Sequence, residues 1–350
     1  MPELTDEQQA VFDEALAFVR APHVDRPYFL YEALAGSGKT VVLSKLARAL
    51  RGATMCAFTG KAASVLSRKS GMQATTIHSA IYQFAGETDD GDLLFDAKVE
   101  DGDWHGHVAL VDESGTVDTD LARDLLATGC RVVACGDPGQ LKPVRGERYF
   151  RDPNAVLRTV HRQAWDSPIV RQAHRVQATG FYAADGDAFR VERFVERDDI
   201  LTADVILCWR NATRSNLNHL KRAHLGLAGA PVMAGEPLMC LRNDHKRGLL
   251  NGAVYPSLID RRPWDPVVVT NERGSEVEVE GRIEDLEPPS TDRKVLPFCF
   301  GYAATVHKFQ GSEADMVILV DEYDRTDDRT SWLYTGLTRA AKAVIVQRNW

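Results

Sequence analysis

Short apolar runs alternate, in the first half of the chain, with stretches in which apolar residues recur every three or four positions. Such runs are typical of strands buried on both faces, and the periodic stretches are typical of helices that cross over a parallel sheet. The predicted strands of this half are Tyr28–Leu34, Ala53–Phe58, Val108–Val111 and Arg131–Cys135. The pattern therefore predicts an α/β fold built on a parallel sheet.

The second half repeats this pattern and then interrupts it. Its predicted sheet strands are Ala203–Trp209, Phe298–Ala303, Met316–Val320 and Ala343–Gln347. Between Glu236 and Val295 the chain changes to short alternating segments, separated by Asn-Gly and Arg-Gly turns. Alternation with such turns indicates antiparallel strands, so we expect a small β barrel inserted at residues 235–297.

A second insert, at residues 84–106, interrupts the first half before the strand at Val108. It contains Asp90-Gly91, a hairpin turn signal, and eight acidic residues between Glu87 and Asp103 against one lysine, Lys98. We expect a short acidic hairpin here.

Length and composition indicate how many domains the chain forms. A chain of 350 residues with 44% hydrophobic content indicates two globular domains, which we place at residues 1–152 and 153–350. The chain has no long apolar run and begins with an acidic segment, so we expect a cytoplasmic protein without a membrane or targeting segment. The six cysteines are scattered, which predicts neither disulfides nor a zinc site.

The net charge of −8 argues against a static basic clamp on nucleic acid. Any nucleic-acid binding must then use local groups. One basic segment is Arg158–Arg175, which could equally be a solvated helix face.

The segment Glu32–Thr40 has the pattern of a phosphate-binding loop between a strand and the helix predicted at Val41–Leu50. Glycines at 36 and 38 let the backbone wrap closely round a phosphate, and the helix start favours an anion. Lys39 can reach the β- and γ-phosphates of ATP, and the Thr40 hydroxyl can bind Mg²⁺. Ala33 stands where the usual pattern begins with glycine.

Two further strand ends carry groups suited to phosphate chemistry. Asp112 and Glu113 follow a buried strand, where Asp112 would hold Mg²⁺ through water and Glu113 would polarise the attacking water. Gln140 follows the next strand and could sense the γ-phosphate. The second half has no phosphate loop, so we expect it to close over a nucleotide shared with the first.

These residues resemble superfamily-one helicases, in the branch that contains the RecD-like and Dda-like 5′-to-3′ enzymes. The similarity runs through the chain in order, with segments like the Q motif, motifs I and Ia, the DNA-contact motif that follows them, and motifs II, III, IV, V and VI. The matching segments are Leu4–Gln8, Ala35–Thr40, Ala57–Ala63, Thr75–Ser79, Asp112–Gly115, Gly136–Val144, Val160–Gln163, Ala304–Glu313 and Tyr334–Ala340.

The resemblance implies two RecA-like domains, the first with a hairpin wedge and the second with an SH3-like β barrel. It implies a nucleotide site made by Gln8, Ala35, Gly36, Ser37, Gly38, Lys39, Thr40, Asp112, His161, Gly311 and Glu313. Catalysis would use Lys39, Glu113 and Gln140, with Arg162 and Arg339 as arginine fingers from the second half. Single-stranded DNA would contact Thr59, Lys61, Thr76, His78, Thr305 and His307, and the wedge would present Phe95 or Trp104.

The leading interpretation is an ATP- and Mg²⁺-dependent 5′-to-3′ DNA helicase. It would act as a monomer on single strands and single-to-double-strand junctions, with partners in replication, recombination or repair, in a bacterial or phage-infected cell. Two alternatives stay open. An RNA helicase of the same superfamily would use the same backbone contacts, and a nucleotide-gated loading module would grip DNA without unwinding it. The 5′-to-3′ direction follows from the resemblance alone.

Overall fold

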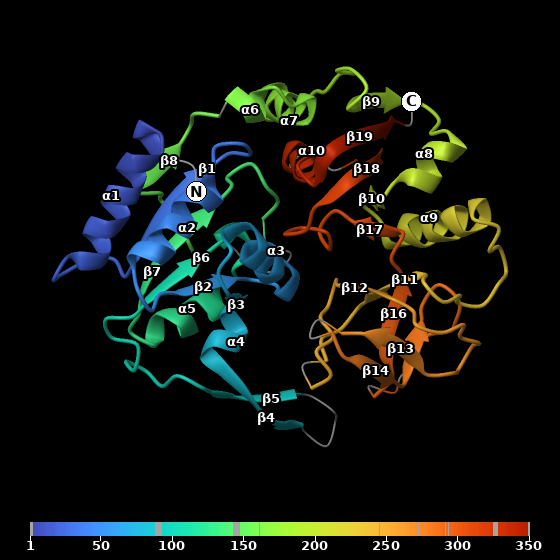
Figure 1. Ribbon diagram of the computed structural model, residues 1–350, viewed down its shortest axis with the longest axis horizontal. Coiled ribbons are helices and arrows are strands. Elements are labelled where there is room, and N and C mark those ends of the chain that lie inside the picture. Colours follow the sequence, from blue (N-terminus) through green and yellow to red (C-terminus); the bar gives the residue numbers. More distant parts are fainter. Residues whose placement is uncertain are drawn as a thin grey trace. The chain divides into compact units, whose positions relative to one another are not determined.

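A computed structural model describes residues 3–87, 93–142, 148–160, 162–244, 246–271, 274–290, 292, 294–324 and 328–348. The chain forms two compact units, Met1–Gly180 and Phe181–Trp350 (Figure 1). The boundary expected after residue 152 is wrong, because α6 (Arg162–Trp165) and α7 (Pro168–Thr179) pack on the first unit. Ala164 and Val170 lie directly against Gly36 there.

The first unit contains a six-stranded sheet in the order β3-β2-β6-β7-β1-β8, and every neighbouring pair is parallel. Its strands are β1 (Tyr28–Ala33), β2 (Thr54–Ala57), β3 (Ala74–Thr76), β6 (Val108–Val111), β7 (Arg131–Gly136) and β8 (Ala155–Leu157). The four predicted strands are therefore confirmed, whereas β3 and β8, three residues each, carry too short an apolar run to be predicted.

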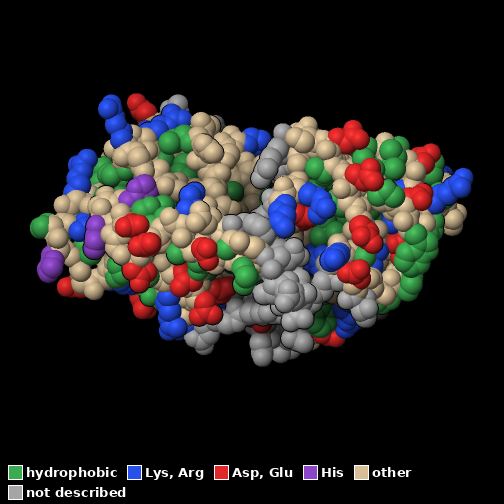
Figure 2. Space-filling model, turned by 90° about the horizontal axis from the view of Figure 1, so that it is seen from below, with side chains coloured by type: hydrophobic (Ala, Val, Ile, Leu, Met, Phe, Trp, Pro, Cys, Tyr) green, Lys and Arg blue, Asp and Glu red, His purple; other side chains and the backbone are tan. Residues whose placement is uncertain are grey.

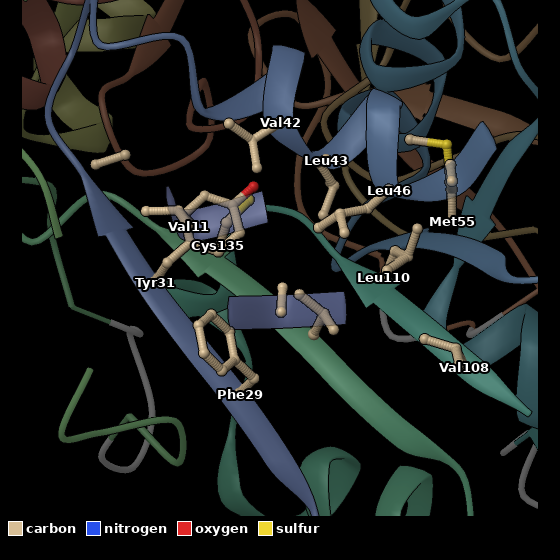
Figure 3. Close-up of a cluster of buried hydrophobic side chains, with 14 of the residues drawn as sticks. Val11, Phe29, Tyr31, Val42, Leu43, Leu46, Met55, Val108, Leu110 and Cys135 are labelled. Atoms are coloured by element: carbon tan, nitrogen blue, oxygen red, sulfur yellow. The ribbon is translucent and has the colours of Figure 1, made fainter. Parts of the chain in front are cut away.

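Helices cover both faces of this sheet, because alternate residues of each strand point to opposite faces. Phe29 and Tyr31 pack on one face against Val42 and Leu46, in the core of Figure 3, while Leu30 packs on the other. The helices are α1 (Asp6–Arg20), α2 (Lys39–Ala49) and α3 (Gly60–Ser70) on the first face, and α4 (Ile77–Ile81) and α5 (Thr119–Ala127) on the second.

The acidic insert contains the antiparallel pair β4 (Tyr82–Glu87) and β5 (Leu93–Ala97), which begins two residues before the expected start. The turn signal Asp90-Gly91 lies outside the described residues. Trp104 as a wedge tip is wrong. Its backbone N–H donates to the Thr128 carbonyl (2.7 Å), and its half-buried indole packs on the core of the unit beside His107. A large apolar ring close to a core gains more by joining that core than by facing water.

The second unit has a five-stranded parallel sheet in the order β17-β10-β18-β19-β9. Its strands are β9 (Phe189–Glu192), β10 (Val205–Cys208), β17 (Ala303–Thr305), β18 (Ala314–Asp321) and β19 (Ala340–Arg348). The helices of this unit are α8 (Arg197–Thr202), α9 (Asn211–His224) and α10 (Arg329–Leu337). The strand predicted at Phe298–Ala303 is wrong, because that apolar run divides between two sheets.

The first part of that run, β16 (Leu296–Phe300), belongs to the inserted β region, where it pairs antiparallel with β11 (Pro237–Cys240) and parallel with β15 (Gly281–Ile283). The sheet order of the insert is β12-β11-β16-β15, with a separate pair β13-β14. The remaining strands are β12 (Val254–Pro256), β13 (Val267–Thr270) and β14 (Glu276–Val279). These strands enclose a hydrophobic core of their own, so the insert is an all-β body.

A buried ion pair joins two loops of this all-β body. Arg261 and Glu287 have side chains that are 1% exposed, and Nη1 of the arginine lies 2.7 Å from Oε1 of the glutamate. The backbone N–H of Trp264 donates to the same carboxylate oxygen (3.2 Å). Trp264 itself is 71% exposed and has a positive φ of 73°, a conformation that is rare outside glycine.

The surface carries both charges. On the face seen in Figure 2, Lys and Arg side chains are interspersed with Asp and Glu. The six cysteines are all buried and form no disulfide. No helix in the described part of the chain is long and apolar enough to cross a membrane.

Candidate functional site

The carboxyl ends of the six parallel strands lie at one edge of the first sheet, and most of the predicted site residues of this unit follow those ends. The nucleotide candidates follow β1, β6 and β7, while the nucleic-acid candidates follow the neighbouring strands β2 and β3. In open parallel sheets this edge is where ligands bind. The fold therefore brings two sets of sequence-distant residues to one edge.

The phosphate loop forms a tight turn between β1 and α2. Gly36 and Gly38 have φ angles of 84° and 83°, which side chains disfavour, so the glycines are needed for the path of the backbone. Ser37 closes the turn, because its N–H (3.2 Å) and its hydroxyl (2.6 Å) both donate to the Leu34 carbonyl. The helix begins at Lys39. The N–H groups of its first turn are a ready anion site.

Lys39 lies beside the carboxylates at the end of β6. Its Nζ is 2.9 Å from Oε1 of Glu113, and the two side chains are 18% and 16% exposed. Burial opposes the charge of the ammonium, but the carboxylate of Glu113, with that of Asp112 close by, outweighs burial and raises the pKa of Lys39. Lys39 is thus a permanent cation at the phosphate loop.

Asp112 and Glu113 are held differently. Oδ1 of Asp112 accepts hydrogen bonds from the Cys135 thiol (3.1 Å) and the Glu113 N–H (2.9 Å). Glu113 has a φ of 53°, an uncommon conformation for a residue with a side chain, and such strain clusters at functional sites. The backbone thus turns sharply at the residue that the sequence assigns to water activation.

The donor set fits Mg²⁺. A magnesium ion on a nucleotide usually takes one or two protein oxygens and completes its shell with phosphates and water. Thr40 at the start of α2 and Asp112 at the end of β6 supply a hydroxyl and a carboxylate. Within the described ranges no three His, Cys, Asp or Glu side chains form a separate metal cluster.

The turn after β7 packs closely on the one after β6. A Cβ atom at Gly136 would lie 2.8 Å from the Ser114 hydroxyl, so a larger residue there would displace the Ser114 side chain. The Asp137 carboxylate accepts the Gly139 N–H (3.0 Å), and Gln140 is buried beside it. Arg148, which was not among the predicted site residues, donates to the Gln140 carbonyl (2.6 Å). Glu32, whose carboxylate interacts electrostatically with Arg148, was not predicted either. Burial raises the pKa of the Glu32 carboxyl.

Gln8 contacts the phosphate loop itself. Its Nε2 donates to the Ser37 carbonyl (2.9 Å), while its Oε1 accepts the Thr5 N–H (3.2 Å) at the start of α1. The adjacent Glu7 was also missed: its carboxylate accepts the N–H groups of Arg158 and Thr159 at 2.8 and 2.9 Å. Burial opposes this charge, but the two N–H donors prevail and lower the pKa of Glu7. The start of α1 thereby ties the phosphate loop to the segment before α6.

The predicted DNA contacts of the first unit lie at two helix starts. Thr59 caps α3 by accepting the Ala62 N–H (3.2 Å), and Lys61 is in the first turn of that helix. Thr76 caps α4 by accepting the Ser79 N–H (3.0 Å). Helix starts favour phosphate groups, so both positions suit a nucleic-acid backbone.

His78 is packed between aromatic rings. Its ring centroid lies 4.4 Å from that of Phe95, edge to face, and 4.7 Å from that of Tyr82. Phe95 lies within β5, opposite Phe84, and not at the hairpin's turn. The assignment of Phe95 to a wedge tip is therefore wrong: the ring instead joins the hairpin to α4.

Four predicted residues of the second unit, Thr305, His307, Gly311 and Glu313, lie at the end of β17 and just after it. Oγ1 of Thr305 accepts the Lys308 N–H (3.3 Å), and burial lowers the pKa of the nearby His307. Nζ of Lys308 donates to the side chain of Asn251 (3.1 Å), which belongs to the inserted β body. Gly311 has a φ of 76°, and Glu313 lies two residues further on. This segment is thus tied to the insert.

Arg339 is buried in its own unit. Its guanidinium donates to the Thr335 carbonyl (3.0 Å) and the Ser312 carbonyl (3.2 Å), which joins the end of α10 to the turn after β17. Residue 162 lies in α6 and so in the first unit, which corrects its expected place in the second half. His161 and the side chain of Arg162 lie outside the described residues.

The phosphate loop, the paired carboxylates and the parallel sheet define the class of P-loop nucleotide-binding proteins. Residues 3–200 match the family model described as AAA domain, and residues 300–347 match the UvrD-like helicase C-terminal domain. The first match spans more than half of the chain, so the chain belongs to the AAA-domain family. Together with the RecD2 relative described next, the two matches confirm the resemblance to superfamily-one helicases of the RecD-like and Dda-like branch.

Two curated relatives match most of the chain. It is 25% identical over 327 residues to the ATP-dependent RecD2 DNA helicase of Deinococcus radiodurans, a match that covers 82% of this chain and 41% of the relative. It is 27% identical over 358 residues to the conjugal transfer protein TraA of Rhizobium radiobacter, a match that covers 90% of this chain and 30% of the relative. The chain thus spans less than half the length of these relatives.

Two solved structures have a similar fold. The Pif1 helicase from Candida albicans has a TM-score of 0.58 at 18% identity, with 100% of this chain and 95% of the other covered. The Bacteroides Pif1 bound to single-stranded DNA has a TM-score of 0.59 at 18% identity, with 99% and 93% covered. The likeness supports an α/β fold with parallel sheets of the RecA-like kind.

Proposed function

We propose that the protein is an ATP- and Mg²⁺-dependent DNA helicase that moves 5′ to 3′ along a single strand. The observation that carries the proposal is the edge of the first sheet, where Lys39 and Glu113 meet beside the phosphate loop and the helix starts at Thr59 and Thr76 follow the adjoining strands. One sheet edge thus holds groups for a nucleotide and groups for a nucleic-acid backbone.

In this proposal each residue at the nucleotide site has a separate task. Lys39 neutralises the β- and γ-phosphates, Thr40 and Asp112 hold Mg²⁺, and Glu113 orients the attacking water. Gln140 senses the γ-phosphate, and Gln8 adds its contact with the loop carbonyl. Arg162 and Arg339 stabilise the charge of the transferring phosphoryl group, for which Arg339 must exchange its present carbonyl partners.

The remaining assignments concern DNA. We propose that six residues contact phosphates or bases of DNA, on single strands and at junctions: Thr59, Lys61, Thr76, His78, Thr305 and His307. The hairpin β4–β5 is our candidate for the wedge, and its aromatic contact with His78 would hold it in a fixed orientation on α4. The inserted β body is our candidate for an SH3-like barrel.

A strand-displacement assay tests the proposal. With ATP and Mg²⁺, a duplex with a 5′ single-stranded tail should be opened, and a duplex with a 3′ tail should not. The Lys39→Ala protein is the matched control, and a variant with a short Gly-Ser turn in place of the hairpin should hydrolyse ATP on DNA without opening the duplex.

Each alternative has its own outcome in this experiment. Opening of the 3′-tailed duplex alone would reverse the direction. Stimulation of ATP hydrolysis by single-stranded RNA but not DNA would favour an RNA helicase. DNA-stimulated hydrolysis with neither duplex opened would favour a loading module.

A further inference from the structure

The phosphate loop contains two peptide units that can reorient easily. They are the units Ala35–Gly36 and Ser37–Gly38, because each ends in a glycine at positive φ and glycine lacks the Cβ that restricts rotation. A peptide unit is planar and trans, so its C=O and N–H point in opposite directions. A bond that fixes the carbonyl of residue 35 therefore also aims the Gly36 N–H the opposite way.

Each of these two carbonyls accepts a hydrogen bond from a side chain outside the loop. Gln8 on α1 donates to Ser37, as described above. The second donor is His174 on α7, whose Nε2 lies 3.0 Å from the Ala35 carbonyl oxygen. A carbonyl can only accept, so Nε2 must carry the proton in this bond.

Packing holds the His174 ring in place for this bond. Trp165 covers one side, with ring centroids 5.4 Å apart. One turn before His174, Val170 lies 3.4 Å from where a Cβ of Gly36 would be. The same helix surface thus touches the loop at two positions one turn apart. The helix α7 ends at Thr179, and its C-cap Gly180 is the last residue of the first unit.

We infer that His174 is a positioning residue of the nucleotide site, which holds the Ala35–Gly36 peptide so that the Gly36 N–H faces the bound phosphate. The inference rests on the proposed nucleotide site but not on DNA binding or unwinding. In this role, His174 lets α7, the helix that leads into the second unit, control the orientation of a peptide group in the phosphate loop.

Two substitutions separate the hydrogen bond from the shape of the ring. His174→Phe keeps a planar ring but cannot donate, whereas His174→Gln can donate through its amide. The Phe variant should bind the fluorescent N-methylanthraniloyl derivative of ADP about 5- to 10-fold more weakly, the effect of one hydrogen bond. The Gln variant should bind within about twofold of the native protein, and His219→Phe, at an exposed position of α9, is the matched control.

Hydrogen exchange gives an independent reading without nucleotide. The amides of residues 35–38 should exchange faster in the Phe variant than in the native and Gln proteins, while those of β7 should not change. If the Phe variant does not fold, His174→Ala replaces it with the same expectations. Equal affinity and equal exchange in the Phe and native proteins would overturn the inference, as would a loss that Gln fails to restore. If the native protein binds no nucleotide, the proposed function fails and the exchange experiment alone decides the role of His174.

Discussion

Two ion pairs in this protein each join a basic side chain to a glutamate, and they do so in opposite surroundings. Lys39 and Glu113 are partly exposed at the sheet edge of the first unit, and Glu113 has a strained backbone. Arg261 and Glu287 are sealed within the inserted β body, next to the strained residue Trp264. The two ion pairs are therefore chemically similar but differ in exposure to solvent.

The hydrogen bonds round each pair explain the difference. Arg261 also donates to the Asp265 carbonyl (2.8 Å) and the Gly281 carbonyl (2.7 Å), and Glu287 accepts the Ile283 N–H (2.9 Å). Such a network is satisfied within the fold and stabilises it. Lys39 and Glu113 keep exposed surface, so water and a ligand can reach them. An ion pair that stays partly exposed next to other charged groups indicates a functional site. An ion pair that is fully buried and fully hydrogen-bonded indicates a structural role.

The largest expected effect is on ATP turnover. Lys39→Ala should abolish it, because the phosphate charge is no longer neutralised.

Glu113→Gln should lower turnover by about 10²–10⁴-fold, the usual contribution of a positioned base, and leave nucleotide affinity almost unchanged. Steady-state hydrolysis and equilibrium binding of an ADP analogue measure the two effects. Near-native turnover in the Glu113→Gln protein would contradict the assignment of Glu113.

The second effect is on stability. Glu287→Ala should destabilise the second unit by about 3–5 kcal/mol, because it leaves the Arg261 charge buried without its partner. Urea denaturation followed by tryptophan fluorescence measures this loss, while nucleotide binding by the first unit should stay native.

The matched control for Glu287→Ala replaces both partners. Arg261→Met combined with Glu287→Leu should recover part of the stability, because it removes both charges from the interior. Recovery should be incomplete, because the carbonyls of Asp265 and Gly281 and the Ile283 N–H each lose a hydrogen bond. A single Glu287→Ala change that costs less than about 1 kcal/mol would show that the two pairs do not differ as described.

The smallest effect concerns Trp264. Trp264→Gly should stabilise the second unit by at most about 1 kcal/mol, because relief of the left-handed conformation outweighs the entropy that glycine adds to the unfolded chain. The side chain is 71% exposed, so little packing is lost. Trp264→Ala keeps the strain and should bring no gain in the same denaturation experiment. A marked loss of stability with glycine would show that the indole contributes contacts to the fold.

Local patterns predicted the turn between β1 and α2 and the acidic end of β6 well. The phosphate loop and the Asp112-Glu113 strand end are defined by neighbouring residues, and the fold brings Lys39 to Glu113 as the shared sheet edge requires. Phe298–Ala303 failed for the opposite reason. An apolar run fits either sheet, and only pairing with β11, far away in sequence, decides that residues 296–300 join the insert.

Several site residues could not be predicted because they act at a distance. Glu7, Arg148 and His174 each form a hydrogen bond with a backbone group of another segment. Because nearly all residue types have the same backbone C=O and N–H groups, the sequence does not show which of them will be the partner. Phe95 and Trp104 were expected at a tip because a wedge would present an apolar side chain there. In the structure His78 and the core of the first unit give them partners.

The position of β1 in its sheet also has a consequence for the synthesis of the protein. β1 precedes the phosphate loop, yet its two neighbours are β7 and β8, and the latter ends at Leu157. At about 5–20 residues per second, a ribosome needs roughly 6–25 s to extend the chain from β1 to the end of β8. Until β7 has been synthesised as far as Gly136, for roughly 5–21 s at the same rate, β1 has neither of its hydrogen-bonded neighbours, and its apolar side chains are available to chaperones. The nucleotide site can therefore form only after nearly the whole first unit has left the ribosome.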